Sequence, residues 1–267
     1  MNKIFLIVIF GISSLYSANN ECIVTMGYKP KQKEPYILED NSGLYQELYT
    51  KALSDIGCKL VIQRKPKKRV INSIKKGTID FYPGFNFSEK RAKMVYYIKN
   101  GLPKGFTAIT RADIKDLTSK NNIKSQKLRN ITELGGTDLL KDLNLETITS
   151  SGLNVKKAIL MIQKERADIF IYNKSQIDFY IKKYKPKNIK THPNLYKKSE
   201  SLYLGFSKKS KYIKEVVNKN YDKTKAIGLN NFPSVLDKNC IAYKLEISLQ
   251  NLKDNGYTDK IYTKYFK

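Results

Sequence analysis

The chain has 267 residues, and its 50 lysines and arginines outnumber its 24 aspartates and glutamates, which gives a formal net charge of +26. Only six of the basic residues are arginine and the lysines are spread along the whole chain, whereas recognition of base edges favours arginine forks. We therefore expect no nucleic-acid partner and interpret the lysines as a solvated surface, with attraction to anionic membranes as the lesser alternative.

The first 18 residues predict a secretory signal peptide. Met1-Asn2-Lys3 precedes an uncharged apolar run at residues 4–12, and small and polar residues follow up to Ala18. The run is shorter than the roughly 20 residues that a membrane-spanning helix needs. We expect cleavage near Ala18 and a periplasmic location, with a retained membrane anchor as the less favoured alternative.

Strand and helix patterns then alternate. An apolar strand pattern covers residues 22–28, and others cover residues 58–64 and 79–82. Between the first two lies a helical pattern whose apolar side chains are four residues apart: Leu44, Leu48, Ala52 and Ile56. A shorter helix, closed by Gly77, precedes the third strand. This alternation predicts a parallel sheet covered by helices, so the fold class is α/β.

Three cysteines follow the signal peptide. Cys22 and Cys58 each open a strand pattern, so their thiols lie at the same end if the two strands are parallel neighbours. Export to an oxidising space favours a disulfide between them, which leaves Cys240 as a free buried thiol. The single histidine, His192, is expected on the surface, and no Cys or His pair has ligand spacing, so neither a metal nor a cofactor is expected.

An internal repeat indicates two lobes. Ile71 is followed nine residues later by Asp80, which stands at the start of an apolar strand. Ile159 is followed in the same way by Asp168, nine residues later and at the start of another apolar strand. Coincidence is the alternative explanation of this repeat, because the junction of a helix and a strand is a simple pattern. We interpret the repeat as two lobes of like topology that face each other across a cleft.

The chain is expected to cross between the lobes twice. A strand pattern at residues 105–110 leaves the first lobe, and one at residues 201–206 returns to it. The predicted organisation is a signal peptide at 1–18, the first part of lobe 1 at 19–110, lobe 2 at 111–203, and a return to lobe 1 at 204–267. Ligands of open α/β sheets lie beyond the carboxyl ends of the strands, which places the ligand in the cleft.

Seven short stretches, in order along the mature chain, resemble the family 3 extracellular solute-binding proteins that serve amino-acid ABC importers. They are Pro35-Tyr36, Pro66-x-x-Arg69, and residues 77–80, 87–91, 135–137, 166–168 and 255–266. The resemblance implies a two-lobed venus-flytrap with two crossover strands. It also implies a small-molecule ligand, a membrane permease as partner, and a monomer.

The same resemblance implies the ligand site. Arg91 matches the arginine that holds the ligand's carboxylate, and a guanidinium presents a donor fork that fits a carboxylate; a surface ion pair is the alternative. The other implied site residues are Gly84, Phe85 and Asn86 in the first lobe, Gly136 and Thr137 in the second, and Tyr36 or Tyr28 as an aromatic wall.

One departure from the family concerns the ligand's amine. Amino-acid binders place an aspartate against the ligand's ammonium at the position of Asn173, and asparagine brings no charge. We therefore expect a carboxylate-bearing solute, an amino acid or a related organic acid, and leave the α-amino group open. The alternatives are a sensor whose closed lobes are detected by another protein and a dehydratase like the cyclohexadienyl dehydratases. No acid near the cleft is marked for catalysis, so we do not expect an enzyme.

Overall fold

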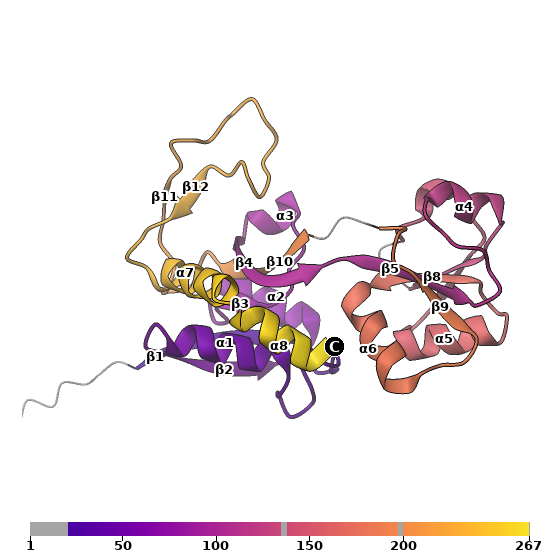
Figure 1. Cartoon of the computed structure of the whole chain (residues 1–267). Helices are drawn as coiled ribbons and strands as arrows, with labels where there is room; N and C mark the ends of the chain where they lie inside the picture. The colour runs from indigo at the N-terminus through magenta and orange to yellow at the C-terminus, as the bar shows by residue number, and fades with distance from the viewer. Residues whose placement is uncertain (1–20, 135–137, 197–199, 267) are drawn as a thin grey trace, which may run out of the picture.

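The computed structural model describes residues 21–134, 138–196 and 200–266 (Figure 1). These residues form two lobes, each built on a five-stranded sheet with helices packed against it. The predicted signal peptide, Gly136 and Thr137 lie outside the described residues. In the part of the chain that the structure describes, no helix is both long and apolar enough to span a bilayer.

The first sheet has the strand order β2-β1-β3-β10-β4. Its strands are β1 (Cys22–Tyr28), β2 (Cys58–Arg64), β3 (Phe81–Tyr82), β4 (Val95–Lys104) and β10 (Glu200–Ser207). Strand β1 is parallel to β2 and β3, whereas β10 is antiparallel to both of its neighbours, β3 and β4. The helices of this part of the chain are α1 (Leu44–Ser54), α2 (Lys67–Lys76) and α3 (Glu89–Ala92).

Helix α2 ends where its sequence predicts, whereas α1 ends at Ser54, before the predicted stop at Gly57. Leu44, Leu48 and Ala52 of α1 are fully buried, which confirms the four-residue apolar spacing. Helix α2 ends at Gly77, whose φ of 77° lies in the left-handed region. A Cβ atom there would lie 2.1 Å from the carbonyl oxygen of Lys209, so only glycine allows the helix to end against this backbone.

The second sheet has the strand order β7-β6-β8-β5-β9. Its strands are β5 (Phe106–Arg111), β6 (Asn130–Glu133), β7 (Thr147–Ser150), β8 (Ile169–Asn173) and β9 (Ile189–His192). The accompanying helices are α4 (Lys120–Ser125), α5 (Val155–Gln163) and α6 (Lys174–Tyr184), with a 3₁₀ turn at Lys141–Leu143. Apolar residues of β6, β8 and α5, among them Ile131, Phe170 and Ile162, are buried between the sheet and its helices.

The two sheets share one topology, which confirms the predicted internal repeat. In the first, Asp80 precedes β3, and its carboxylate accepts the amide hydrogen of Thr25 on β1 at 2.7 Å. In the second, Asp168 precedes β8, and its carboxylate accepts the amide hydrogen of Arg129, beside β6, at 3.0 Å. The amide of each aspartate also donates to the carbonyl of the same partner. Each aspartate therefore joins the start of its own strand to the neighbouring parallel strand.

Sheet membership places both crossings earlier than the predicted lobe limits. Strand β4 of the first sheet leads through Gly105 directly into β5, which pairs with β8 and β9 of the second sheet. The expected limit at residue 110 therefore falls inside β5. On the return, β10 of the first sheet begins at Glu200. The reason for the first shift is that β4 and β5 form one nearly continuous extended run, so no break in the pattern marks the change of sheet.

The C-terminal segment returns to the first lobe, as predicted. Helices α7 (Ile241–Asp254) and α8 (Tyr257–Phe266) contribute Leu245, Leu249 and Ile261 to the first core. Before them, β11 (Glu215–Val217) and β12 (Ser234–Leu236) pair as an antiparallel ribbon. Figure 1 shows the ribbon and the long loop beyond it projecting from the first lobe.

The predicted disulfide between Cys22 and Cys58 is present. The two residues lie directly opposite each other at the starts of the parallel strands β1 and β2. Cys240 is free and only half-buried, in contrast to the buried thiol that we expected. It is the N-cap of α7, where its sulfur accepts the amide hydrogen of Tyr243, and this position keeps it near the surface.

The surface position expected for His192 is wrong, because its side chain is 2% exposed. The amide of Leu117 donates to Nδ1 at 3.1 Å, and Nε2 lies 2.8 Å from the hydroxyl oxygen of Thr110. Since Nδ1 accepts, the neutral ring carries its proton on Nε2 and donates it to Thr110. Local polarity suggested a loop, whereas the pairing of β9 with β5 buries the ring.

We expect His192 to make folding sensitive to pH. Burial lowers its pKa below the usual value, so the unfolded chain binds the proton more readily and the unfolding free energy falls as the pH drops below about 6.5. His192→Gln, which keeps an acceptor and a donor, should remove this part of the slope. Urea unfolding of both proteins at about pH 7.5 and about pH 5.5 measures it. Identical slopes in the two proteins would contradict the prediction.

Candidate functional site

A cavity of about 500 Å³ opens between the two lobes. Aromatic residues form the largest group in its wall, and we call it the aromatic chamber: Phe85, Phe87, Phe106, Phe170, Tyr172 and Tyr203. Polar side chains from both lobes also face it, namely Asn86, Lys104, Thr132, Glu133 and Ser201. An apolar cavity of this size with a few convergent polar groups is typical of a small-molecule site.

A second cavity of about 280 Å³ adjoins the first and shares Glu133, Leu153 and Tyr172 with it. We call it the lysine chamber, because Lys29, Lys31 and Lys33 line it. Tyrosines and amides make up much of the remaining wall: Tyr28, Tyr45, Tyr82, Tyr180, Gln32, Asn154 and Gln176. The cleft therefore has an apolar part and a polar, basic part.

Arg91 lines neither chamber, but it contacts two residues of the aromatic chamber's wall, Phe85 and Asn86. Ser88 caps the short helix α3 by accepting the amide hydrogen of Arg91 at 3.3 Å. The guanidinium then donates from Nη1 to the carbonyl oxygen of Asn86 at 2.9 Å, and its carbon lies 4.9 Å from the ring centroid of Phe85. A guanidinium has five N–H donors, and one of them is used among the described residues.

The predicted segment at residues 84–86 reaches both chambers. Gly84 lines the lysine chamber, and Phe85 and Asn86 line the aromatic chamber. Gly84 has a φ of 65°, and a Cβ atom there would lie 2.7 Å from the hydroxyl of Tyr45. Glycine therefore lets the chain turn between the chambers.

The two predicted aromatic candidates have different surroundings. Tyr36 lines neither chamber and is fully buried in the first lobe, with the rings of Tyr45 and Phe266 each 5.0 Å away. Tyr28 lines the lysine chamber, where it stacks on Tyr82 at 5.4 Å. Of the pair, Tyr28 is the one at the cleft.

Asn173 lines neither chamber. It ends β8 and caps α6, with its side-chain oxygen accepting the amide hydrogen of Gln176 at 3.3 Å. Its acceptor is therefore engaged in holding the helix. Gly136 and Thr137, the predicted turn of the second lobe, lie outside the described residues.

Sequence reasoning missed Glu133, the acid that lines both chambers. It is the last residue of β6, and Tyr28 is the last residue of β1, the equivalent strand of the first lobe. Because the carboxyl ends of parallel strands meet at one sheet edge, the end of each strand pattern was a usable signal. Burial and the charge of Glu133 raise the pKa of the neighbouring Tyr172.

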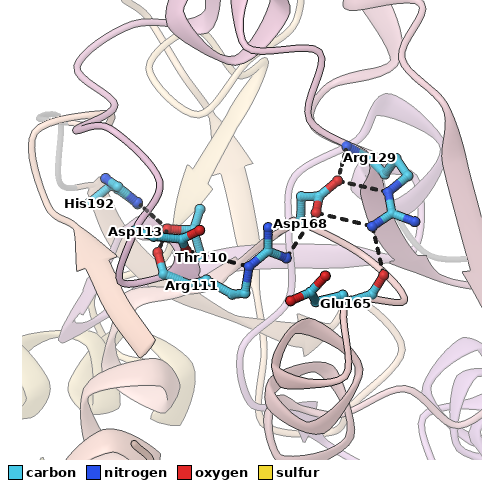
Figure 2. Close-up of polar contacts among 7 residues, drawn as sticks. All are labelled: Thr110, Arg111, Asp113, Arg129, Glu165, Asp168 and His192. Carbon is cyan, nitrogen blue, oxygen red and sulfur yellow. Dashed lines mark hydrogen bonds and ion pairs between the residues drawn. The ribbon is translucent and has the colours of Figure 1, made fainter. Parts of the chain in front are cut away.

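The strongest charged cluster lies at the other end of β8. Figure 2 shows the carboxylate of Asp168 between the guanidinium groups of Arg111 and Arg129, at 3.1 Å and 2.8 Å. Burial alone would raise the pKa of Asp168, but the hydrogen bonds from the two arginines outweigh it and lower the pKa to about 2. Because residues 170–172 of β8 line the aromatic chamber, this cluster joins strands and does not face the cleft.

Two lobes of like topology, two crossings and a cleft between the lobes define the fold of the two-lobed periplasmic binding proteins. The ligand-binding core of GluR0 in complex with L-glutamate is similar at a TM-score of 0.68 and 9% identity, over 93% of this chain and 100% of that chain. An ancestral arginine-binding protein bound to arginine is similar at 0.61 and 18%, over 92% and 98%.

A third similar structure is the ancestral amino-acid-binding protein AncCDT-1, a precursor of cyclohexadienyl dehydratase, with a TM-score of 0.62 and 16% identity over 92% of this chain and 95% of that chain. These neighbours are of the family 3 type, so the predicted resemblance is confirmed in the fold. No protein-family model and no curated protein sequence matches the chain. Among the described residues, no group of His, Cys, Asp and Glu side chains could hold a metal ion.

Proposed function

We propose that the protein captures a small carboxylate-bearing solute in the periplasm and delivers it to the membrane permease of an ABC importer. The observation that carries the proposal is the guanidinium of Arg91, which donates to the backbone carbonyl of Asn86, a residue in the wall of the cavity between the two lobes. A desolvated site strengthens the attraction between a guanidinium and a carboxylate. The proposed role is binding without a chemical step.

The first lobe presents residues 84–86, with Arg91 bonded to the carbonyl of Asn86, and the second lobe presents Glu133 and Tyr172 across the cleft. A ligand that contacts both lobes binds the closed arrangement more tightly than the open one, and this difference in affinity is what shifts the equilibrium. The crossings through Gly105 and before Glu200 are the connections about which the lobes would turn. A permease can then distinguish the liganded protein by its shape.

Arg91→Ala is expected to weaken binding of a carboxylate ligand by at least about 2 kcal/mol, or roughly thirtyfold, because it removes the carboxylate's charged partner. Arg91→Lys should restore little, since an ammonium lacks the planar fork. A thermal-shift screen of amino acids and organic acids would find the ligand, since one present at 100 times its Kd stabilises the protein by about 2.7 kcal/mol. Calorimetry would then compare the variants.

Arg69→Ala is the matched control, because Arg69 is exposed on α2 and, in contrast to Arg91, its side chain is not bonded to a residue of the aromatic chamber's wall among the described residues. It removes the same charge and should leave the Kd unchanged. Small-angle scattering with saturating ligand should show a smaller radius of gyration in the wild type. Wild-type affinity in Arg91→Ala would overturn the proposed site.

A further inference from the structure

The lysine chamber is lined by three lysines of one loop, between β1 and α1. Lys29, Lys31 and Lys33 all line this cavity. Within the described residues, none of the three ammonium groups is placed in a hydrogen bond or an ion pair, and that of Lys33 lies 4.7 Å from the ring centroid of Tyr36. Three lysines around one cavity repel each other unless an anion lies among them.

The acids of the chamber do not balance this charge. Two carboxylates line it, those of Glu34 and Glu133. Glu34 is already engaged, because the ammonium of Lys183 lies 3.0 Å from its Oε2. Glu133 is left facing the three lysines from the second lobe, so the unliganded chamber carries an excess of positive charge.

The titration of two of these lysines agrees with that excess. Burial lowers the pKa of Lys29, although Glu133 partly opposes the change. Burial, together with the charge of Lys29, lowers the pKa of Lys33 to about 8. Both groups therefore hold their protons less firmly than a solvated lysine does. An anion in the chamber would raise both pKa values by stabilising the charged forms.

We propose that the lysine chamber is an anion subsite formed by Lys29 and Lys33, and that the ligand carries a second anionic group, a carboxylate or a phosphate. The inference rests on the proposed function, because the first carboxylate is the one assigned to Arg91. The two chambers meet at residues 84–86, where Gly84 faces one and Asn86 faces the other. A single ligand can therefore place one anionic group on each side of this segment.

Two matched pairs of probes test the second anionic group: L-glutamate with L-glutamine, and succinate with succinamate. Within each pair an amide of similar shape replaces one carboxylate, and inorganic phosphate alone serves as a free anion. The diacid of at least one pair should bind the wild type about tenfold more tightly than its amide. Lys29→Met combined with Lys33→Met should abolish that preference and change the Kd of the amide by less than about threefold.

Lys75→Met combined with Lys76→Met is the control, since both residues are exposed on α2 and line neither chamber. It should keep the preference for the diacid. Equal affinities within both pairs in the wild type, or a preference that survives loss of Lys29 and Lys33, would overturn the inference. Phosphate binding without preference within either pair would assign the chamber to a free anion and would also overturn the two-group ligand. Failure of every dianion to bind at millimolar concentration would also contradict a ligand with two anionic groups.

Proton uptake gives a second readout. Near pH 8, where Lys33 is partly deprotonated, binding of the diacid should take up a fraction of a proton, at most about one half from this residue. Calorimetry in buffers of different ionisation enthalpy measures that uptake, which should disappear in Lys33→Met. Uptake that persists in this variant would contradict the role of Lys33.

Arg91→Ala separates the two proposals. If the wild type binds carboxylates through Arg91 but shows no preference for a diacid, the anion subsite is wrong and the proposed function stands. If Arg91→Ala binds both members of a pair as the wild type does, the proposed function is wrong. Each failure therefore has its own signature.

Discussion

Replacing both Cys22 and Cys58 with alanine is expected to lower the free energy of unfolding by about 3 to 4 kcal/mol. The bond joins residues separated by 36 positions, and closing a loop of that size restricts the unfolded chain by about this amount in the chain-entropy model. Urea unfolding followed by circular dichroism measures the loss. The slope with urea should increase, because an unlinked chain exposes more surface when it unfolds.

Cys240→Ala is the control for the disulfide, since Cys240 is free and only half-buried. It removes a sulfur cap of α7 and should cost about 1 kcal/mol or less. Non-reducing peptide mapping should recover Cys22 linked to Cys58. An unfolding midpoint that does not change in the double variant would show that the bond does not restrict the unfolded chain as expected.

Asp168→Ala is expected to cost about 3 kcal/mol of stability in the second lobe. The substitution leaves the guanidinium groups of Arg111 and Arg129 without their shared carboxylate and removes the acceptor for the amide of Arg129. Removing one partner of a buried ion pair is costly because the remaining charge stays desolvated. Asp168→Asn keeps an acceptor and should lose less stability than Asp168→Ala. Urea unfolding of the wild type and both variants measures the two losses.

Asp142→Asn is the matched control within the same lobe. Its carboxylate pairs with Lys120 at 2.9 Å, but the side chain is 56% exposed, so the change should cost less than about 1 kcal/mol. Similar losses in Asp142→Asn and Asp168→Ala would contradict the assigned role of the buried cluster.

The same cluster predicts an acid dependence. The pKa of Asp168 is lowered to about 2 from 3.8 in the folded protein, so its stabilisation is complete above the unfolded value and is lost as the pH falls through the folded one. Below about pH 4 the wild type should lose stability more steeply than Asp168→Asn. In contrast, burial raises the pKa of the equivalent Asp80 above 3.8 despite hydrogen bonds from Ser210 and Thr25, so its contribution has the opposite sign and changes with pH above about 3.8.

Much of the fold could be predicted because short patterns determine it. Apolar spacing, a terminal glycine and strand-like runs predicted α1, α2, β1 and β8, and paired strand starts predicted the bond between Cys22 and Cys58. Asp80 and Asp168 each follow an isoleucine by the same number of residues, and this equal spacing predicted two lobes of one topology. These features depend on the residues of one segment or on a regular repeat of segments.

The site depended more on tertiary structure. Sequence similarity led to residues 84–86, which line the cleft, and to Arg91, which is bonded to Asn86 there. It also led to Tyr36, which packs in the first core, and to Asn173, which caps α6. Two aromatic residues eight positions apart in one segment cannot be told apart by pattern when one faces the core and the other the cleft. Neighbours distant in sequence decide that Tyr28, and not Tyr36, lines the lysine chamber.

The sequence by itself determined the α/β class, the two-lobed repeat and the disulfide, because each follows from local periodicity or from a pattern of fixed spacing, whereas the role of Arg91 comes from the family resemblance and stays a prediction. Only the tertiary structure decided that β5 belongs to the second sheet, that His192 is buried, and that Glu133 faces three lysines. Burial and charge balance depend on which segments meet in space. For these residues the partners come from strands and loops far apart in the chain.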